Sequence, residues 1–410
     1  MTGLGVISPI GIGVDAFWKA ALEGRSGISA LTEVEGFPVE RFRSRVGGRI
    51  RDFTPSEHLD PGLADRLDRH AQFALVAAQQ AIRDAELRME REPTHRVGVV
   101  VGAGMGAMTM GERELTKLYE SQRPDRVHPN FIPTITLNSA SGLVALAHGA
   151  RGPNLTVSTA CSSSAHALGL SLGFLRGGQA DAMIVIGTEA SITPLSLGGF
   201  TSLRALSTSF NDTPERASRP FDRARDGFVM GEGAAALILE TWPHARKRKA
   251  RMYAEVAGYA ATSEAYHMVM PQEDGRESAR TMELALDDAG LAPSRVDYIN
   301  AHATATPVGD PVEIRAIRRV LKRRANHVLV NATKSLLGHT LGAAGAIGAV
   351  TCILSLTTGQ VHPTLNYDDP DPECVLPGIS RQAQGRPLRV ALLNAFGFGS
   401  NNASLVLKAL

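Results

Sequence analysis

Residues 156–179 read TVSTACSSSAHALGLSLGFLRGGQ, and residues 329–360 read LVNATKSLLGHTLGAAGAIGAVTCILSLTTGQ. Each segment combines a short strand-like run, a polar turn and a helical stretch of small residues that ends in Gly-Gln. Helices with so few bulky side chains can pack backbone against backbone, so we expect both at the centre of a layered structure. The repeat predicts two copies of one α/β unit that meet near residue 250.

Apolar runs rich in β-branched residues recur outside these segments and predict buried strands, with amphipathic helical patterns between several of them. The predicted strands lie at residues 97–101, 183–187, 234–240, 328–330 and 390–394, and the clearest helical patterns lie at 70–86 and 277–290. The fold class is therefore α/β.

The charge balance of the chain argues against a nucleic-acid-binding protein. Its 410 residues carry 43 basic and 41 acidic side chains, and the one basic run is the short RKRKAR at 246–251. Phosphate binding needs a concentrated basic face, which this balance does not provide. We expect the apolar run within 341–360 to be too short to span a membrane and to form a buried core helix. The sequence shows no basic start followed by an apolar stretch and a cleavage site, so no secretory signal is expected.

The three cysteines are Cys161, Cys352 and Cys374, an odd number without a C-x-x-C pair. This spacing suggests neither a disulfide framework nor a zinc site, and it fits a reducing cytosol. Cys352 and Cys374 are interpreted as buried, inert thiols.

Cys161 occupies a more reactive position, at the point where a strand turns into a helix. Unpaired backbone N–H groups and the positive end of the helix dipole favour a thiolate there. A backbone N–H at such an elbow can also bind the oxyanion that forms on an acyl group. A lone cysteine is more often structural, so this interpretation depends on partners elsewhere in the chain.

Two histidines supply those partners. His302, in YINAHATATPVGD, and His339, in NATKSLLGHTLGAAG, occupy strand-to-helix junctions in the second half, at the edge equivalent to that of Cys161. We expect the three side chains to converge on one pocket, where two imidazoles could stabilise an enolate or carry a proton. The positive charge of Lys334 could set the electrostatic field around these side chains. His166 lies about 140° around the helix from Cys161 and is predicted to be a core or interface residue.

The glycine-rich stretch VVVGAGMGAMTMG at 99–111 resembles a dinucleotide-binding fingerprint only superficially. The acidic residues that follow it, Glu114 and Glu120, are poorly placed for a ribose contact. A close crossing of two backbones explains the glycines better.

Taken together, these residues resemble the β-ketoacyl-acyl carrier protein synthases, the decarboxylating condensing enzymes of fatty-acid and polyketide synthesis. The similarity covers nearly the whole chain. The motifs that carry it are TGLGVISPIG at 2–11, STACSSSAHALG at 158–169, RALSTSFNDTPERASRPFDRARDGFVMGEGA at 204–234, INAHATATPVGD at 299–310, KSLLGHTLGAAGA at 334–346 and NAFGFGSNNAS at 394–404.

The resemblance implies a thiolase-like fold, a duplicated five-layer α-β-α-β-α architecture that usually forms homodimers. The nucleophile would lie in an N-terminal half, residues 1–250, and the two catalytic histidines in a C-terminal half, residues 251–410. It also implies an acyltransferase that condenses an acyl group with malonyl-acyl carrier protein to give 3-oxoacyl-acyl carrier protein in the cytoplasm.

By resemblance, Cys161 is the nucleophile that takes the acyl chain as a thioester. His302 and His339 would promote decarboxylation and stabilise the enolate, and Lys334 would support this histidine pair. The backbone N–H groups of Cys161 and Phe398 would form the oxyanion hole, and Phe398 would also be the gate to the acyl pocket.

The family's pantetheine-binding threonines match Thr304 and Thr306. An acidic acyl carrier protein would dock at an arginine-lined entrance, for which Arg66, Arg69 and Arg204 are candidates. The resemblance implies no metal and no dissociable cofactor, because the carrier protein supplies the phosphopantetheine.

The chain also departs from the family pattern. Ala303 and Ala305 stand within the usual H-G-T-S-T, the later motifs have Ala395, Ser400 and Asn401 where N-S-F and G-F-G-G-T-N are usual, and Gly348 replaces a glutamate expected near Lys334. These differences suggest a specialised synthase.

Three functions remain open. The first is an elongating synthase of fatty-acid synthesis that forms a homodimer, and the second is a ketosynthase of a type II polyketide or polyene system, paired with a chain-length factor. A non-catalytic scaffold that only binds carrier protein is the third. A thiolase is disfavoured because no second catalytic cysteine follows Cys374, and an initiating synthase because His339 stands where that class has asparagine.

Overall fold

Two large sheets organise the chain in a computed structural model that describes all residues 1–410. The first sheet has six strands, in the order β2 (Gly11–Ile12), β1 (Gly3–Ser8), β11 (Gly233–Glu240), β9 (Ala182–Glu189), β7 (Val97–Gly102) and β8 (Asn154–Val157). The second has five, in the order β12 (Ala254–Ser263), β18 (Asn401–Ala409), β17 (Val390–Gly397), β13 (Tyr298–Asn300) and β14 (Leu329–Asn331).

The two sheets repeat one topology. From β1 to β8 the successive pairings are antiparallel, antiparallel, parallel and parallel, and the pairings from β12 to β14 follow the same sequence. Strand β8 in the first sheet therefore corresponds to β14 in the second, and β7 corresponds to β13. This correspondence confirms the duplication expected from the repeated segments.

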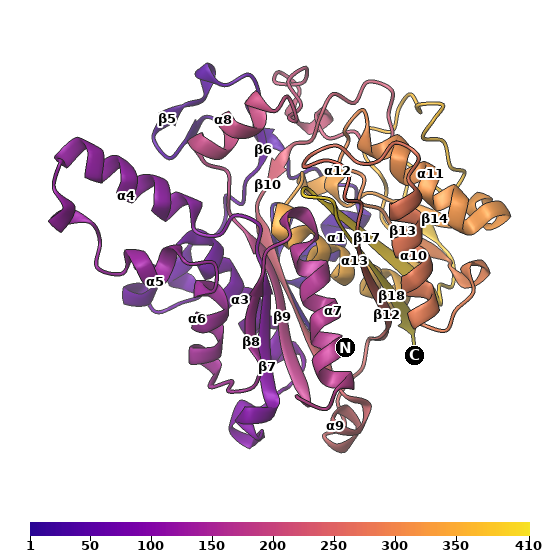
Figure 1. Cartoon of the computed structure of the whole chain (residues 1–410), viewed down its shortest axis with the longest axis horizontal. Helices are drawn as coiled ribbons and strands as arrows, with labels where there is room; N and C mark the ends of the chain where they lie inside the picture. The colour runs from indigo at the N-terminus through magenta and orange to yellow at the C-terminus, as the bar shows by residue number, and fades with distance from the viewer.

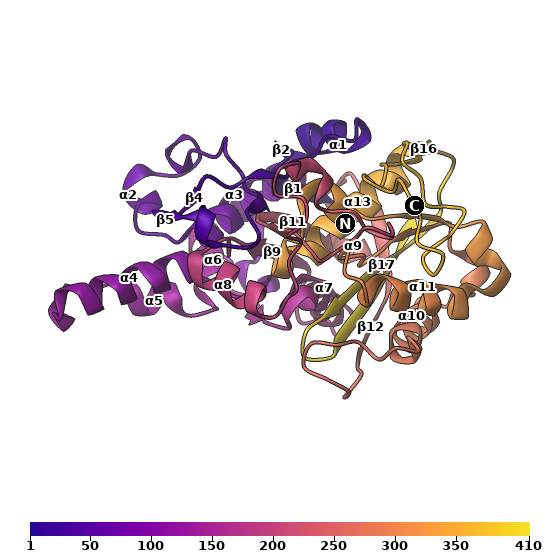
Figure 2. The ribbon, with the colours of Figure 1, turned by 90° about the horizontal axis from the view of Figure 1, so that it is seen from above.

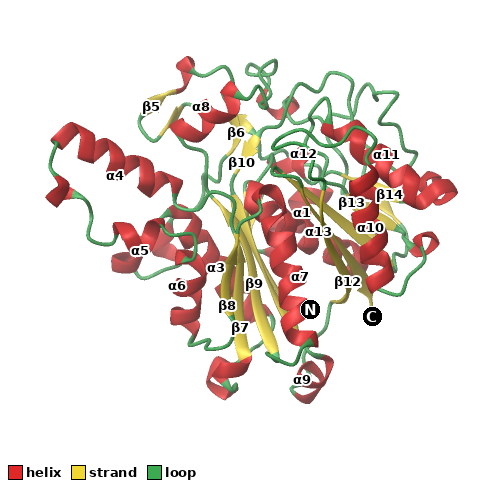
Figure 3. Ribbon diagram, in the orientation of Figure 1, coloured by secondary structure: helices red, strands yellow, loops and turns green.

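Helices separate and cover the sheets in five layers (Figure 1; Figure 3). Helix α3 (Arg69–Asp84) packs on the outer face of the first sheet, and α7 (Ser163–Arg176) and α13 (Ala344–Thr358) lie together between the two sheets. Helices α10 (Arg276–Asp288) and α11 (Gly309–Leu321) cover the second sheet.

The small residues of α7 and α13 allow these central helices to touch through their backbones. A Cβ on Gly345 would lie 2.6 Å from the backbone nitrogen of Ala165. The Ser164 hydroxyl accepts a hydrogen bond from the Ala346 N–H at 2.8 Å. Such contact is available only to helices without bulky side chains on the facing stripe.

The remaining helices surround or connect these layers, and α4 and α5 extend away from the first sheet (Figure 2). They are α1 (Val14–Leu22), α2 (Pro61–Ala64), α4 (Met108–Ser121), α5 (Phe131–Ile135), α6 (Ser139–His148), α8 (Pro194–Ser202), α9 (Trp242–Lys247) and α12 (Lys334–Leu337). Short strands complete the fold: β3 (Ser29–Ala30), β4 (Glu33–Val34), β5 (Phe37–Pro38), β6 (Val46–Gly48), β10 (Met230–Gly231), β15 (Gln360–Val361) and β16 (Gln384–Gly385).

The stretch Leu341–Thr358 is long and apolar enough to cross a membrane by length and composition alone, but 83% of it is buried inside the protein. It includes α13, which both sheets enclose. The prediction of a buried core helix is confirmed, but the expectation that the run is too short to span a membrane is wrong, because burial and not length identifies it as a core helix.

Candidate active site

Cys161 lies in a tight elbow between β8 and α7. The residue before it, Ala160, has φ +51°, a left-handed conformation that a residue with a side chain adopts only when its surroundings impose it. Hydroxyl groups supply that constraint, because Ser163 donates to the Ala160 carbonyl at 2.6 Å and Ser162 donates to the Thr159 carbonyl at 2.8 Å. The serines of the STACSSS motif therefore shape the turn that presents the thiol.

One cavity of about 540 Å³ brings the main predicted residues together. It is lined by Cys161, His302, His339, Phe398, Thr304, Thr306 and Arg204, among others. The two threonine hydroxyls lie 3.2 Å apart. Lys334 stands behind the cavity wall, and its ammonium group donates to the His302 carbonyl at 2.5 Å.

The histidines are held perpendicular to each other, with ring centroids 5.6 Å apart. The Leu341 N–H donates to Nδ1 of His339 at 3.3 Å, which assigns the ring proton to Nε2 in the neutral tautomer. That Nε2, like Nδ1 of His302, is buried and has no hydrogen-bond partner in the protein. Burial, and secondarily the Lys334 charge, hold the pKa of both rings well below the usual range, so both are neutral at pH 7.

Burial raises the pKa of the Cys161 thiol to about 11, although Lys334 and the backbone N–H groups of Phe398 and Cys161 lower it in part. The sequence pattern had suggested a thiolate at this helix start, and enclosure in the protein outweighs that local effect. The resting protein therefore holds a thiol. The same two N–H groups are available to an oxyanion that forms next to the sulfur.

Glu313, which the sequence analysis missed, holds the backbone that carries His302. This buried carboxylate accepts hydrogen bonds from the N–H groups of His302 at 2.8 Å and Ala303 at 2.7 Å, and from the Asn394 amide at 3.0 Å. Its charge also favours the protonated form of Lys334, whose pKa burial lowers to about 8. A signal was present, because Asp310 and Glu313 occupy core-facing positions of α11 that ordinarily carry apolar residues.

Glu189 is a second missed residue, at the end of β9. Its buried carboxylate accepts hydrogen bonds from the N–H groups of Gly104 at 2.7 Å and Gly342 at 3.1 Å, and from the Ser191 hydroxyl at 2.6 Å. It thereby ties the loop after β7 to the start of the α13 region. A carboxylate directly after the apolar run AMIVIGT was the available signal.

Gly348 lies in α13, where the resemblance expects a glutamate. A Cβ there would come within 2.7 Å of Oδ1 of Asn300 and 2.6 Å of Cδ1 of Leu393, so the neighbouring side chains already fill this space. The Asn300 amide donates to Oδ1 of Asn331 at 2.9 Å and to Oγ1 of Thr333 at 2.8 Å. The buried carboxylate that acts on Lys334 is supplied by Glu313 instead.

The three arginines considered for docking have different surroundings. Arg204 is exposed and lines the cavity. Arg66 is exposed but does not line it. Arg69 is engaged inside the protein, since its guanidinium donates to Glu232 at 2.7 Å and to the Ile50 carbonyl at 2.6 Å.

His166 and the glycine-rich stretch lie apart from this chemistry. Nδ1 of His166 is 2.6 Å from the hydroxyl of Tyr259, and the ring does not line the cavity. A Cβ on Gly102 would come within 2.4 Å of the backbone of Ser164, which is the close backbone crossing that the sequence predicted. No group of three or more His, Cys, Asp and Glu side chains is arranged to hold a metal ion.

Comparison with known proteins identifies the family of this site. Residues 1–245 match the model of the beta-ketoacyl synthase N-terminal domain, and residues 253–368 match that of the C-terminal domain. The chain belongs to the β-ketoacyl synthase family. It is 45% identical over 408 residues to the 3-oxoacyl-[acyl-carrier-protein] synthase 2 of Synechocystis sp., covering 100% of this chain and 97% of that relative.

Solved β-ketoacyl synthases share its fold. A ketosynthase in complex with its type II polyketide-synthase acyl-carrier protein, bound to the hexaketide, superimposes with a TM-score of 0.92 and 37% identity. The ishigamide ketosynthase/chain length factor gives 0.91 and 32%, and each match covers 100% of this chain and 98% of the other. The thiolase-like α/β fold that the motifs implied is confirmed.

Proposed function

We propose that the protein is a 3-oxoacyl-acyl carrier protein synthase that condenses a Cys161-bound acyl group with malonyl-acyl carrier protein. One observation carries the proposal: a single cavity holds a thiol beside two backbone N–H groups, together with two neutral imidazoles that have unused ring nitrogens. This set suits acyl transfer followed by stabilisation of an enolate.

The first half-reaction loads the acyl group. The Cys161 sulfur attacks the thioester carbonyl of the acyl-phosphopantetheine while its proton passes to a neutral imidazole, and the oxyanion is bound by the N–H groups of Cys161 and Phe398. Collapse of the tetrahedral intermediate expels the pantetheine thiolate, which takes that proton. The acyl chain remains on Cys161 as a thioester.

The second half-reaction forms the carbon–carbon bond. Malonyl-acyl carrier protein loses carbon dioxide, and the electron pair of the broken bond becomes an enolate that hydrogen bonds from His302 and His339 stabilise. The enolate carbon attacks the Cys161 thioester, the oxyanion hole binds the new charge, and collapse releases the Cys161 thiolate, which takes a proton from water. Because decarboxylation generates the carbanion, no strong base is required.

The remaining roles follow from the surroundings of each residue. We propose that Lys334 tunes the cysteine and both histidines through its charge, that Thr304 and Thr306 bind the pantetheine arm, and that Phe398 gates the acyl pocket. The phosphopantetheine arrives with the carrier protein, so the enzyme needs no cofactor of its own. Arg204 at the cavity and the exposed Arg66 are the better candidates for docking an acidic carrier protein, because Glu232 already pairs with Arg69.

Product analysis tests the proposal. The protein is incubated with acyl- and malonyl-acyl carrier proteins, and the enzyme adduct and the product are followed by mass spectrometry. We expect an acyl adduct on Cys161, formation of 3-oxoacyl-acyl carrier protein, and loss of both in Cys161→Ala.

Cys352→Ala is the matched control, because Cys352 is also a buried thiol but lies in α13 outside the cavity. It should retain condensation. Product formation by Cys161→Ala at the wild-type rate, or the absence of any adduct in the wild type, would show that the assignment is wrong.

A second candidate is a ketosynthase subunit of a type II polyketide or polyene synthase, acting with a chain-length factor. It is favoured by the fold similarity to ketosynthases of this kind at 37% and 32% identity. The higher identity to the synthase 2 relative supports the fatty-acid enzyme. The chain length of the products distinguishes the two.

We also propose that the enzyme is cytoplasmic and forms a homodimer, and that residues 1–250 and 251–410 are its two structural halves. The division is supported by the strands of the two sheets, which end at Glu240 and begin again at Ala254. The three free cysteines fit a reducing compartment.

A further inference from the structure

The loop that carries Thr304 and Thr306 has an unfavourable backbone conformation. Ala303 has φ +35° and Ala305 has φ +66°, so two alanines in three consecutive residues are left-handed. Residues with a Cβ hold such angles only when neighbouring groups over-determine them. The anchors of this loop therefore decide whether the two threonine hydroxyls stay in the cavity wall.

The backbone carbonyl groups of the loop are anchored by Arg225 and Gly227. The guanidinium of Arg225 donates from Nε to the Thr306 carbonyl at 3.0 Å and from Nη2 to the Pro307 carbonyl at 3.1 Å. The Gly227 N–H donates to the Ala305 carbonyl at 3.2 Å. The carbonyl groups of three consecutive residues thus accept hydrogen bonds from the short segment 225–227. Arg225 itself does not line the cavity.

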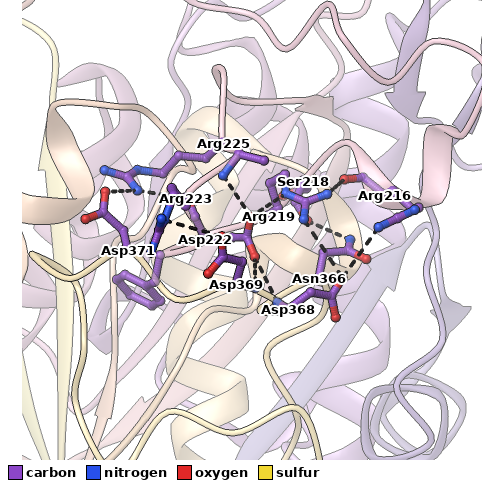
Figure 4. Close-up of polar contacts among 12 residues, drawn as sticks. Arg216, Ser218, Arg219, Asp222, Arg223, Arg225, Asn366, Asp368, Asp369 and Asp371 are labelled. Atoms are coloured by element: carbon purple, nitrogen blue, oxygen red, sulfur yellow. Dashed lines mark hydrogen bonds and ion pairs between the residues drawn. The ribbon is translucent and has the colours of Figure 1, made fainter.

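Two carboxylates, the half-buried Asp371 and the buried Asp310, hold the guanidinium in place. Nη1 of Arg225 donates to Asp371 at 2.7 Å, as Figure 4 shows, and Nε lies 4.0 Å from Asp310. Asp310 in turn accepts hydrogen bonds from the N–H groups of Ala305 at 3.1 Å and Phe221 at 2.8 Å. The side chain of Arg225 is only 4% exposed, so water cannot replace these bonds.

The loop that bears Asp371 is itself fixed to the same segment. Asp222 accepts hydrogen bonds from the N–H groups of Asp368 and Asp369, both at 2.8 Å, and pairs with Arg219 at 2.9 Å (Figure 4). Arg225 therefore connects two loops: the loop of Asp371, which Asp222 holds in place, and the loop of Thr304 and Thr306.

We propose that Arg225 is a positioning residue for the pantetheine arm, because it holds the left-handed Thr304–Thr306 loop through its carbonyl groups without touching the substrate. This inference rests on the proposed function. It goes beyond that function because it makes the position of the two threonines depend on a buried, ion-paired guanidinium outside the cavity.

The test compares Arg225→Met, Arg225→Lys and wild type in steady-state condensation. We expect Arg225→Met to raise KM for malonyl-acyl carrier protein about tenfold, with a smaller change in kcat. Arg225→Lys keeps the charge but cannot reach two carbonyls at once, so its KM should lie between the other two. Should the methionine variant fail to fold, the lysine variant still tests the proposal.

Alkylation of Cys161 by iodoacetamide provides a readout that a general distortion would change. This small reagent needs no pantetheine arm, so its rate should stay within about twofold of wild type in both variants. Arg223→Met is the matched control. Arg223 lies two residues away, is 61% exposed and pairs with Asp369, and its removal should leave KM unchanged.

The outcomes separate this inference from the proposed function. Failure of wild type to condense would contradict the function itself. Active Arg225 variants with wild-type KM would overturn the positioning role alone. A rise in KM together with a fall in kcat and in the alkylation rate would also overturn it, because that pattern indicates general damage to the site.

Discussion

At the scale of single residues, the site combines an uncharged thiol with one buried cation. Burial holds Cys161 as a thiol and both histidines as neutral rings, while Lys334 has a pKa of about 8 and is largely protonated at pH 7. The sulfur can become a thiolate only by passing its proton to an imidazole or by loss of that proton at high pH. The reactivity of Cys161 should therefore report the charge on Lys334.

Replacing Lys334 with methionine should slow alkylation of Cys161 by iodoacetamide below pH 8. The Lys334 charge lowers the pKa of the thiol, and one pKa unit changes the thiolate fraction about tenfold. Wild-type rates should rise with pH towards the thiol pKa of about 11. Above pH 8 wild-type Lys334 loses its proton, so the two proteins should converge.

Lys334→Arg, which keeps the charge, is the control and should follow wild type below pH 8 more closely than the methionine variant does. The measurement is the alkylation rate from pH 6 to 10. Identical profiles for wild type and Lys334→Met would contradict the electrostatic role.

At the scale of elements, the packing of α7 depends on individual glycines. A Cβ on Gly169 would lie 2.3 Å from the ring of Tyr259, which is held by its hydrogen bond to His166. One turn further along the helix, a Cβ on Gly173 would meet nothing within 4 Å. The same helix thus offers one glycine that packing requires and one that it does not.

Gly169→Ala should lower the free energy of unfolding by about 2 kcal/mol, because the ring or the helix must move. Gly173→Ala should raise it by roughly 0.5–1 kcal/mol, since alanine is the better helix former. Urea unfolding of both variants measures the difference. Equal stabilities for the two would show that α7 does not contact β12 as closely as described.

The sequence predicted the elements well because their signals are local. The strands β7, β9, β11 and β17 and the helices α3 and α10 follow runs and periodicities that neighbouring residues determine. Cys161, His302 and His339 could be singled out for the same reason, since each occupies a strand-to-helix junction. The structure places all three in one cavity, and their catalytic roles stay predictions. Their ionisation was harder to predict: the helix start favours a thiolate locally, whereas burial depends on the whole fold.

The supporting residues could not be predicted because their partners are distant in the sequence. Glu189 binds the backbone of Gly104 and Gly342, and Arg225 binds that of Thr306, so neither role is visible in a local pattern. The role of Glu313 is another example, because nothing near Lys334 in the sequence reveals that the Glu313 carboxylate raises its pKa.

At the scale of the whole molecule, one end of the first sheet is unprotected. Strand β8 is its edge, and its Leu155 is 44% exposed. Helices α4, α5 and α6, which lie at the same end in Figure 1, expose Tyr119, Ile132 and Leu146. An open strand edge beside apolar side chains is a surface that soluble proteins usually cover.

We expect a second copy of the chain to cover this surface in the proposed homodimer. Analytical ultracentrifugation of the wild type should give twice the chain mass, and Leu146→Lys combined with Leu155→Lys should shift it towards the monomer. Leu284→Lys is the control, because Leu284 is 38% exposed on α10 in the other half, and it should leave the mass unchanged. A monomeric wild type that gains mass only with a related chain would favour the heterodimer instead.

The direct contact between α7 and α13 bears on how such an enzyme can change its substrate over evolutionary time. Cys161 follows a strand of the first sheet, whereas His302 and His339 follow strands of the second. Backbone atoms of Ala165, Gly345 and Ala346 set the separation of these two parts. Cavity-wall residues such as Met105 and Phe200 take no part in that contact. Substitutions there can reshape the cavity while the spacing of the reacting groups is inherited unchanged, which makes substrate range the evolvable property of this scaffold and its chemistry the conserved one.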